Sequence, residues 1–292
     1  MTNRGRRCSG FAAASFRRNK VDLILGFASG EPEDRAVPFF LREEKEVDRL
    51  RWDPACTPNL AKYLLEGKGK KAIIAKPCDA RAVVMYQVEG QLNREDVIII
   101  GMECEGMRSK DGSLAPGCRE CTRHVPPVYD ILIKRKGGRK PSFPEGTPKK
   151  ENGQGTLQDP LAAFQREMEK CILCFSCRQA CYGCYCKTCF MDRDMPNWHP
   201  ADLDLGAKMT FHLGRAMHLA GRCVECGACE RVCPSGVKIR YLIQELTDLC
   251  KEEYGYEAGM NPDEIPAMAA FDTKDREIGF LGGEEDGSGC DV

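Results

Sequence analysis

The chain has 292 residues and a net charge of −1, from 43 basic and 44 acidic residues. A charge so nearly balanced predicts neither a nucleic-acid partner nor binding to an anionic membrane surface. The longest apolar runs, residues 21–28 and 97–102, are far shorter than the roughly 20 residues of a membrane-spanning helix, so no membrane span is predicted either.

Residues 6–18, RRCSGFAAASFRR, are similar to a twin-arginine export signal. Its apolar stretch is too short for export and ends in two arginines, so we expect a cytoplasmic protein. Residues 1–135 are predicted to form an α/β domain. A helix should begin at Thr57, a good N-cap followed by Pro58, and end at Gly67. The predicted strands are short and rich in Val and Ile, and they cover residues 21–27, 71–76, 97–101 and 130–134.

A βαβ unit is predicted from the strand at residues 71–76, a helix at about 79–88 and the strand at 97–101. Its two strands should be parallel neighbours. Residues 102–127 show no regular pattern, and so long a loop in a compact domain is usually functional.

Five glycines and four prolines in residues 136–160 predict a linker. Helices should resume at Leu161 and include one at about residues 238–254. Residues 256–292 are predicted to be a partly disordered tail. Another helix should present one apolar face, formed by Met209, His212, Leu213, Ala216, Met217 and Ala220.

The chain contains 19 cysteines, seven of them in residues 171–189. Cysteines three residues apart rarely satisfy disulfide geometry, which needs Cα atoms within about 7 Å in suitable directions. Metal or cluster binding in a reducing cytoplasm is therefore the better interpretation.

Two stretches share the spacing C-x2-C-x2-C-x3-C, which is that of the bacterial two-cluster ferredoxins. Three thiolates of one turn hold three corners of a 4Fe–4S cube, and a short helix carries the fourth to the other cube. The first cluster is thus predicted at Cys171, Cys174, Cys177 and Cys233. The second is predicted at Cys223, Cys226, Cys229 and Cys181.

Structural zinc is the alternative, although zinc sites favour pairs of C-x2-C separated by a spacer. The first motif departs from the pattern, since Tyr182 rather than proline follows its fourth cysteine. Cys184, Cys186 and Cys189 lack a nearby fourth thiolate. They either pack around the cubes and tune their potential, or take part in another cluster.

A third 4Fe–4S cluster is predicted in the N-terminal half. Cys78 and Cys104 each follow one strand of the βαβ unit, so both should emerge at the same edge of the sheet, where α/β proteins bind ligands. The long loop adds Cys118 and Cys121, and Cys56 is the rival fourth ligand. The alternative is that Cys78 and Cys104 are buried as small apolar residues.

The remaining cysteines, Cys8, Cys250 and Cys290, are isolated and expected to have no part in a site. His212 is expected to be a hydrogen-bonded core residue. The sequence contains no G-x-G-x-x-G, no P-loop and no nucleophile elbow. The predicted class is α+β: an α/β domain with a small parallel sheet (1–135), a linker (136–160), a helical two-cluster ferredoxin-like domain (161–255) and the tail (256–292).

Several phrases carry a family resemblance over residues 20–275: WDPACTPNLAKYL, AKPCDARAVV, EGQLNREDVIIIGMECEGM, CRECTRHVPPVYDILI, GRCVECGACERVCPSGV and YGYEAG. The N-terminal half resembles the beta subunits of deazaflavin-reducing hydrogenases and formate dehydrogenases. The whole chain also resembles the ferredoxin-type subunits of flavin oxidoreductase–heterodisulfide reductase complexes and of anaerobic sulfite reductase.

The resemblance implies a cytoplasmic complex of an anaerobe, in which electrons pass between a flavoprotein oxidoreductase and a partner of the hydrogenase, dehydrogenase or heterodisulfide reductase type. It also implies Cys78 and Cys104 as cluster ligands near a flavin. Three functions stay open: an electron-transfer subunit with no substrate pocket, a catalytic subunit that binds FAD and acts on a deazaflavin or NAD(P)H, and a zinc-stapled interaction protein.

Overall fold

The computed structural model describes residues 10, 12, 21–33, 35–134, 160–193, 195 and 202–269. The predicted linker lies outside these residues except for Pro160, as does most of the predicted tail. No helix in the described part of the chain is long and apolar enough to cross a membrane.

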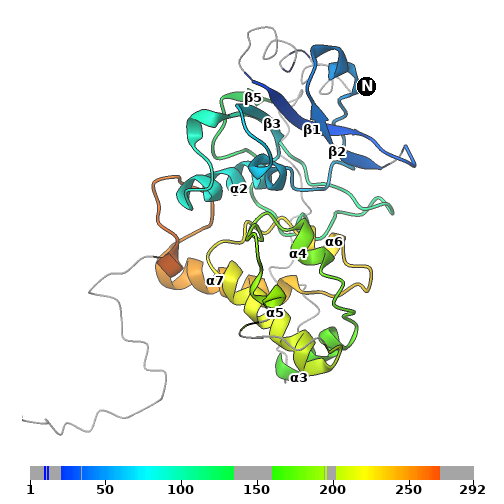
Figure 1. The fold of residues 1–292 in the computed structure, drawn as a ribbon, viewed down its shortest axis with the longest axis vertical. Coiled ribbons are helices and arrows are strands. Elements are labelled where there is room, and N and C mark those ends of the chain that lie inside the picture. Colours follow the sequence, from blue (N-terminus) through cyan, green and yellow to red (C-terminus); the bar gives the residue numbers. More distant parts are fainter. Residues whose placement is uncertain are drawn as a thin grey trace, which may run out of the picture.

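One sheet with the strand order β2-β1-β3-β4-β5 organises the N-terminal half (Figure 1). Strands β1 and β2 are antiparallel, whereas β1–β3, β3–β4 and β4–β5 are parallel. The predicted βαβ unit is confirmed as β3–α2–β4. The elements are β1 (Leu23–Ser29), β2 (Ala36–Leu41), β3 (Lys71–Ala75), α2 (Pro77–Val88), β4 (Val97–Met102) and β5 (Ile131–Ile133).

Strand β2 was not predicted, because Pro38 interrupts its pattern. The proline is tolerated because β2 lies at the edge of the sheet, where one side of the strand needs no ladder donors. The sheet is therefore mixed rather than wholly parallel.

The predicted helix at residues 57–67 is wrong, since only a 3-10 helix forms there, at Ala61–Leu65. Side chains take the backbone groups that would start an α-helix. The Ala61 amide, which would bond to the Thr57 carbonyl in an α-helix, donates to Asn59 Oδ1 at 3.0 Å, and Lys76 Nζ donates to the Pro58 carbonyl at 2.7 Å. Bonds from side chains thus compete successfully with helical ones.

Helices form the C-terminal half: α3 (Pro160–Glu169), α4 (Ser176–Ala180), α5 (Leu205–Leu219), α6 (Ala228–Arg231) and α7 (Arg240–Tyr254). Helices α3 and α7 pack against α5, and α4 packs against α6. The predicted apolar face of α5 is displaced by about one residue, since Leu213 and Met217 are 44% and 54% exposed. The buried face contains Ala207, Phe211, His212, Arg215, Ala216 and Leu219. Arg215 therefore lies in the interior.

The sheet lies at one end of the molecule and α3 to α7 lie at the other (Figure 1). A single core nevertheless joins them, because Tyr182, Val224 and Tyr256 pack into the cluster of buried residues that covers the sheet. The hydroxyl of Tyr86, on α2, donates to the Tyr182 carbonyl at 2.7 Å.

Candidate cluster-binding sites

The two cysteine motifs adopt the same backbone conformation. Leu173 and Glu225, at equivalent positions, have φ of 49° and 56°, and Phe175 and Gly227 follow with 58° and 69°. A left-handed conformation costs a residue other than glycine roughly 1–2 kcal/mol. Such strain concentrates at functional sites, so the turns themselves indicate a binding role.

Each turn aims a backbone amide at the first thiol of its motif. The Leu173 amide donates to Cys171 Sγ, and the Glu225 amide donates to Cys223 Sγ, both at 3.4 Å. Helices α4 and α6 follow the two turns and carry the later cysteines. Amides that donate to cysteine sulfur are among the features that set the potential of iron–sulfur clusters.

The first cavity lies between the first motif and the end of the second. Cys174 is exposed at its rim, whereas Cys171 is buried. A hydrogen bond with Ser176 lowers the pKa of Cys174, while burial raises that of Cys171. The cavity is lined by Cys171, Cys174, Cys177, Cys229 and Cys233. The predicted first set of ligands is thus brought together, including the fourth cysteine from the distant motif.

The second cavity contains the reciprocal set. Its cysteines are Cys181, Cys223, Cys226 and Cys229. Burial raises the pKa of Cys229 to about 12. A hydrogen bond with the Cys184 thiol and the nearby charge of Arg215 lower the pKa of Cys181. Cys229 also lines the first cavity, so one residue separates the two.

The third cavity, of about 230 Å³, opens at the carboxyl ends of β3 and β4 and is lined by Cys78, Cys104, Cys118, Cys121 and Cys226. The amides of Gly106 and Met107 donate to Cys104 and Cys118 Sγ at 3.4 and 3.3 Å. Burial raises the pKa of Cys104 to about 12. Cys226 also lines the second cavity.

A close backbone contact presses the long loop onto the second motif. A side chain at Gly227 would place its Cβ 2.1 Å from the Pro116 carbonyl oxygen, so only glycine fits. Arg231 fixes this contact, with Nη1 donating to Pro116 O at 3.0 Å and Nη2 donating to Thr57 O at 2.8 Å. The C-terminal half thus forms one wall of the third cavity.

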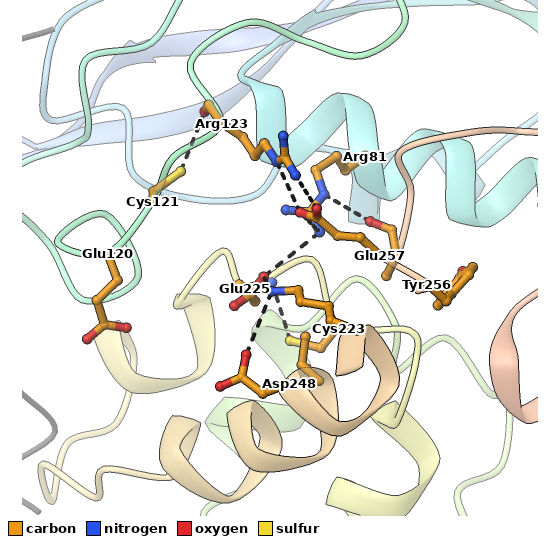
Figure 2. A network of polar contacts seen from close by, with 12 residues as sticks. Arg81, Glu120, Cys121, Arg123, Cys223, Glu225, Asp248, Tyr256 and Glu257 are labelled. Atoms are coloured by element: carbon orange, nitrogen blue, oxygen red, sulfur yellow. Dashed lines mark hydrogen bonds and ion pairs between the residues drawn. The ribbon is translucent and has the colours of Figure 1, made fainter. Parts of the chain in front are cut away.

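Charged side chains surround the third cavity. Arg81 is buried and forms an ion pair with Glu257 at 3.2 Å, and Arg123 also pairs with Glu257 (Figure 2). Glu225 bonds to Lys251 of α7 at 2.9 Å. The ionic groups that line the cavity are Lys76, Arg81, Arg123, Arg231, Arg240 and Lys251 against Glu120, Glu225 and Glu257. This excess of positive charge suits an anionic group.

Sequence analysis missed these basic residues as part of a site, since they come from four separate segments. The one local signal was KPCDAR, in which Lys76 and Arg81 flank Cys78.

Cys56 does not line the third cavity, where its neighbour Thr57 stands. Its Sγ accepts from the Asp53 amide at 3.4 Å and donates to the Arg51 carbonyl at 3.8 Å. The geometry therefore favours Cys104, Cys118 and Cys121 over Cys56 as partners of Cys78.

Of the other cysteines, Cys184 contacts the thiol of Cys181, Cys189 contacts Arg178, and Cys186 is exposed. Cys250 is buried, and Cys8 and Cys290 lie outside the described residues. His212 is buried, as expected, with Nε2 3.3 Å from Cys171 Sγ.

The arrangement of thiols fits cubes better than single metal ions. Among the described His, Cys, Asp and Glu side chains, no three are grouped as one metal ion requires. A structural zinc ion needs four ligands converging at about 2.0–2.3 Å. Each iron of a cube needs one thiolate only, so four thiols spread around a cavity suit a cube. The zinc alternative thus has no ligand set in this part of the chain.

Comparison with known proteins shows that this chain has distant relatives. No protein-family profile matches the chain. It is 20% identical over 362 residues to the F420-dependent formate dehydrogenase subunit beta of Methanocaldococcus jannaschii, covering 87% of this chain and 92% of that protein. It is 22% identical over 367 residues to the F420-dependent formate dehydrogenase 1 subunit beta of Methanococcus maripaludis, covering 89% and 93%. The chain is thus a distant homologue of such beta subunits along nearly its full length.

Proposed function

We propose that the chain is an iron–sulfur electron-transfer subunit. It relays single electrons between a flavoprotein oxidoreductase partner and a downstream reductase, in a cytoplasmic complex of an anaerobe. A 4Fe–4S cluster supplies one-electron transfer when bound. The proposed ligands are the two crossed sets of the ferredoxin-like motifs, and for a third cluster Cys78, Cys104, Cys118 and Cys121.

The observation that carries this proposal is the continuity of the three cavities. Cys226 lines both the third and the second, and Cys229 lines both the second and the first. Twelve cysteines therefore follow one another from the sheet edge to the exposed Cys174. Such a row supports a relay, because each site has a thiol in common with the next.

The chain's own residues supply the rest of the site. Burial keeps thiols such as Cys104 and Cys229 protonated at neutral pH, since it raises their pKa to about 12. Ligands must be deprotonated to bind, so assembly of the clusters releases protons. The basic residues that line the third cavity then offset the negative charge of its thiolates.

A second candidate function is a catalytic beta subunit that binds FAD and acts on a deazaflavin or NAD(P)H. The width and positive charge of the third cavity favour it, and both relatives are named as F420-dependent. In this alternative the cavity holds an anionic cofactor beside the thiols.

The test uses the full chain, reconstituted anaerobically, with iron, acid-labile sulfide and released flavin measured. We expect iron and sulfide in equal amounts, no flavin, and negligible dye reduction by NADH or a reduced deazaflavin until a flavoprotein partner is added. Dye reduction that appears with added FAD alone supports the catalytic alternative. A chain that takes up no iron refutes both functions.

A further inference from the structure

Helix α5 carries one arginine into the protein interior. Arg215 is 3% exposed, and its Nη2 donates to the Cys177 carbonyl at 3.3 Å. Its Nε and Nη1 are buried without a hydrogen-bond partner. A buried guanidinium with two unpartnered nitrogens costs several kcal/mol unless something in the functional protein accepts from them.

Two other arginines of the interior have carboxylate partners. The buried Arg81 pairs with Glu257, and the partly buried Arg240 pairs with Glu120, each at 3.2 Å. Among the described residues, no carboxylate forms an ion pair with Arg215. The acidic groups near its guanidinium are instead the thiols of Cys181, Cys229, Cys177 and Cys184. Cysteine sulfur is therefore what remains, among the described residues, to balance the charge of Arg215.

Three of these thiols belong to the two ferredoxin-like sites. Cys177 lines the first cavity, Cys181 lines the second and Cys229 lines both. Arg215 thus lies at the wall between the two sites. The neighbouring His212 adds no charge at neutral pH, because burial and Arg215 lower its pKa to about 4.

We propose that Arg215 is a potential-setting residue shared by the first and second clusters, toward whose sulfur atoms its free nitrogens donate. This inference rests on the proposed iron–sulfur function. A reduced cluster carries one more negative charge than an oxidised one, so a fixed buried cation favours reduction. Arg215 therefore raises the midpoint potentials of both clusters together and leaves the third, which it does not border, unchanged.

The test is an electron paramagnetic resonance redox titration of the full, reconstituted chain and of Arg215→Gln, Arg215→Lys and Arg178→Gln. Arg178 is the matched control, because it lies beside Cys177 in the sequence but has its own partner, Asp192, at 2.9 Å. In Arg215→Gln we expect the ratio of reduced to oxidised cluster to fall about tenfold at a fixed potential, which is a shift of about 59 mV for one electron. Both ferredoxin-like clusters should shift, while Arg215→Lys and Arg178→Gln should shift less.

Unchanged potentials in an iron-replete Arg215→Gln chain overturn the inference, as does a shift no larger than that of Arg178→Gln. If Arg215→Gln takes up no iron, uptake restored in Arg215→Lys supports the role of the charge. Loss of iron in both variants contradicts it and assigns Arg215 to packing. A wild-type chain without iron refutes the proposed function instead, so the two failures are distinguishable.

Discussion

The ferredoxin-like pair of cavities and the third cavity gather thiols in different ways. In the pair, a left-handed turn and a helix of four or five residues place most of the proposed ligands locally, and only the proposed fourth comes from the other motif. In the third cavity, Cys78 follows one strand, Cys104 follows the next, and the long loop adds Cys118 and Cys121. Local backbone conformation builds the pair, whereas sheet topology builds the third.

The difference extends to the surroundings. Basic residues from separate segments line the third cavity, which is open over about 230 Å³. The cavities of the pair are smaller, about 30 and 20 Å³, and their buried cation is Arg215. We infer that the pair is suited to holding electrons, while the third site is suited to receiving them from an anionic partner group.

The largest effect is expected from the crossed ligands, which define the pair. In Cys233→Ser, the first cluster should be lost while the second is kept. Alkylation and mass spectrometry of the reconstituted chain should then find Cys171, Cys174 and Cys177 reactive. Cys223, Cys226 and Cys229 should stay protected.

In Cys181→Ser the pattern should be reversed, with the second cluster lost and the first kept. Cys250 is buried but lines none of the three cavities, so both sets of cysteines should stay protected in Cys250→Ser. The crossed assignment is wrong if alkylation of Cys233→Ser modifies Cys223, Cys226 and Cys229 instead.

The second prediction compares two cysteines of the N-terminal half. Cys104→Ser should remove about one third of the iron, since it takes away one ligand of one cluster in three. Cys56→Ser is the matched control, because Cys56 is fully buried but bonds to Asp53 and Arg51 instead of lining the cavity. Equal iron loss in both variants, measured per folded chain, restores Cys56 as a rival ligand.

The sequence predicted most where structure depends on short stretches. The βαβ unit and α2 form as predicted, because apolar strands and Pro77 specify them locally. Every cysteine predicted as a ligand lines its own cavity, and Cys229 and Cys226 in addition line the first and third cavities, although cluster binding itself stays a prediction. The helix at residues 57–67 failed because the Asn59 side chain and the distant Lys76 take backbone groups that its first turn needs.

Other features depend on contacts between the halves. Tyr182 stands where the second motif has Pro234, which was a departure from the pattern. The structure gives it a role, since its ring packs against Tyr86 and its hydroxyl donates to the Arg222 carbonyl. The buried face of α5 likewise includes Arg215, which a pattern of apolar residues alone does not predict. Tertiary contacts, not local pattern, decided both.

The third prediction concerns the buried ion pair between Asp79 and Lys76, a residue that lines the third cavity. Lys76 Nζ and Asp79 Oδ2 lie 2.9 Å apart, with side chains 2% and 0% exposed. Asp79→Asn leaves the lysine charge buried and unpaired, which should lower the free energy of unfolding by about 3–5 kcal/mol. The double variant Lys76→Met/Asp79→Asn should recover part of this loss in denaturant titrations. If the double variant is as unstable as the single one, the lost stability comes from the bonds that the Leu60 and Lys76 amides donate to Asp79.

The smallest effect concerns the junction between the two regions. Tyr86 is fully buried, and its hydroxyl donates to the Tyr182 carbonyl at 2.7 Å, one residue beyond Cys181, a proposed ligand of the pair. Tyr86→Phe keeps the ring contacts with Tyr182 and Tyr185, whose centroids lie 5.7 Å away, but leaves a buried carbonyl unpaired. This change should lower the free energy of unfolding by about 1–3 kcal/mol without altering iron content.

The matched control for that junction is Tyr241→Phe. The Tyr241 hydroxyl is buried without a hydrogen-bond partner, so its removal strands no acceptor and should leave stability nearly unchanged. Thermal unfolding of both variants, followed by circular dichroism and by the visible absorbance of the clusters, separates the two effects. Equal shifts in the two variants would show that the Tyr86–Tyr182 bond adds little. The two regions would then be held together by apolar packing and by the Arg222–Glu89 ion pair.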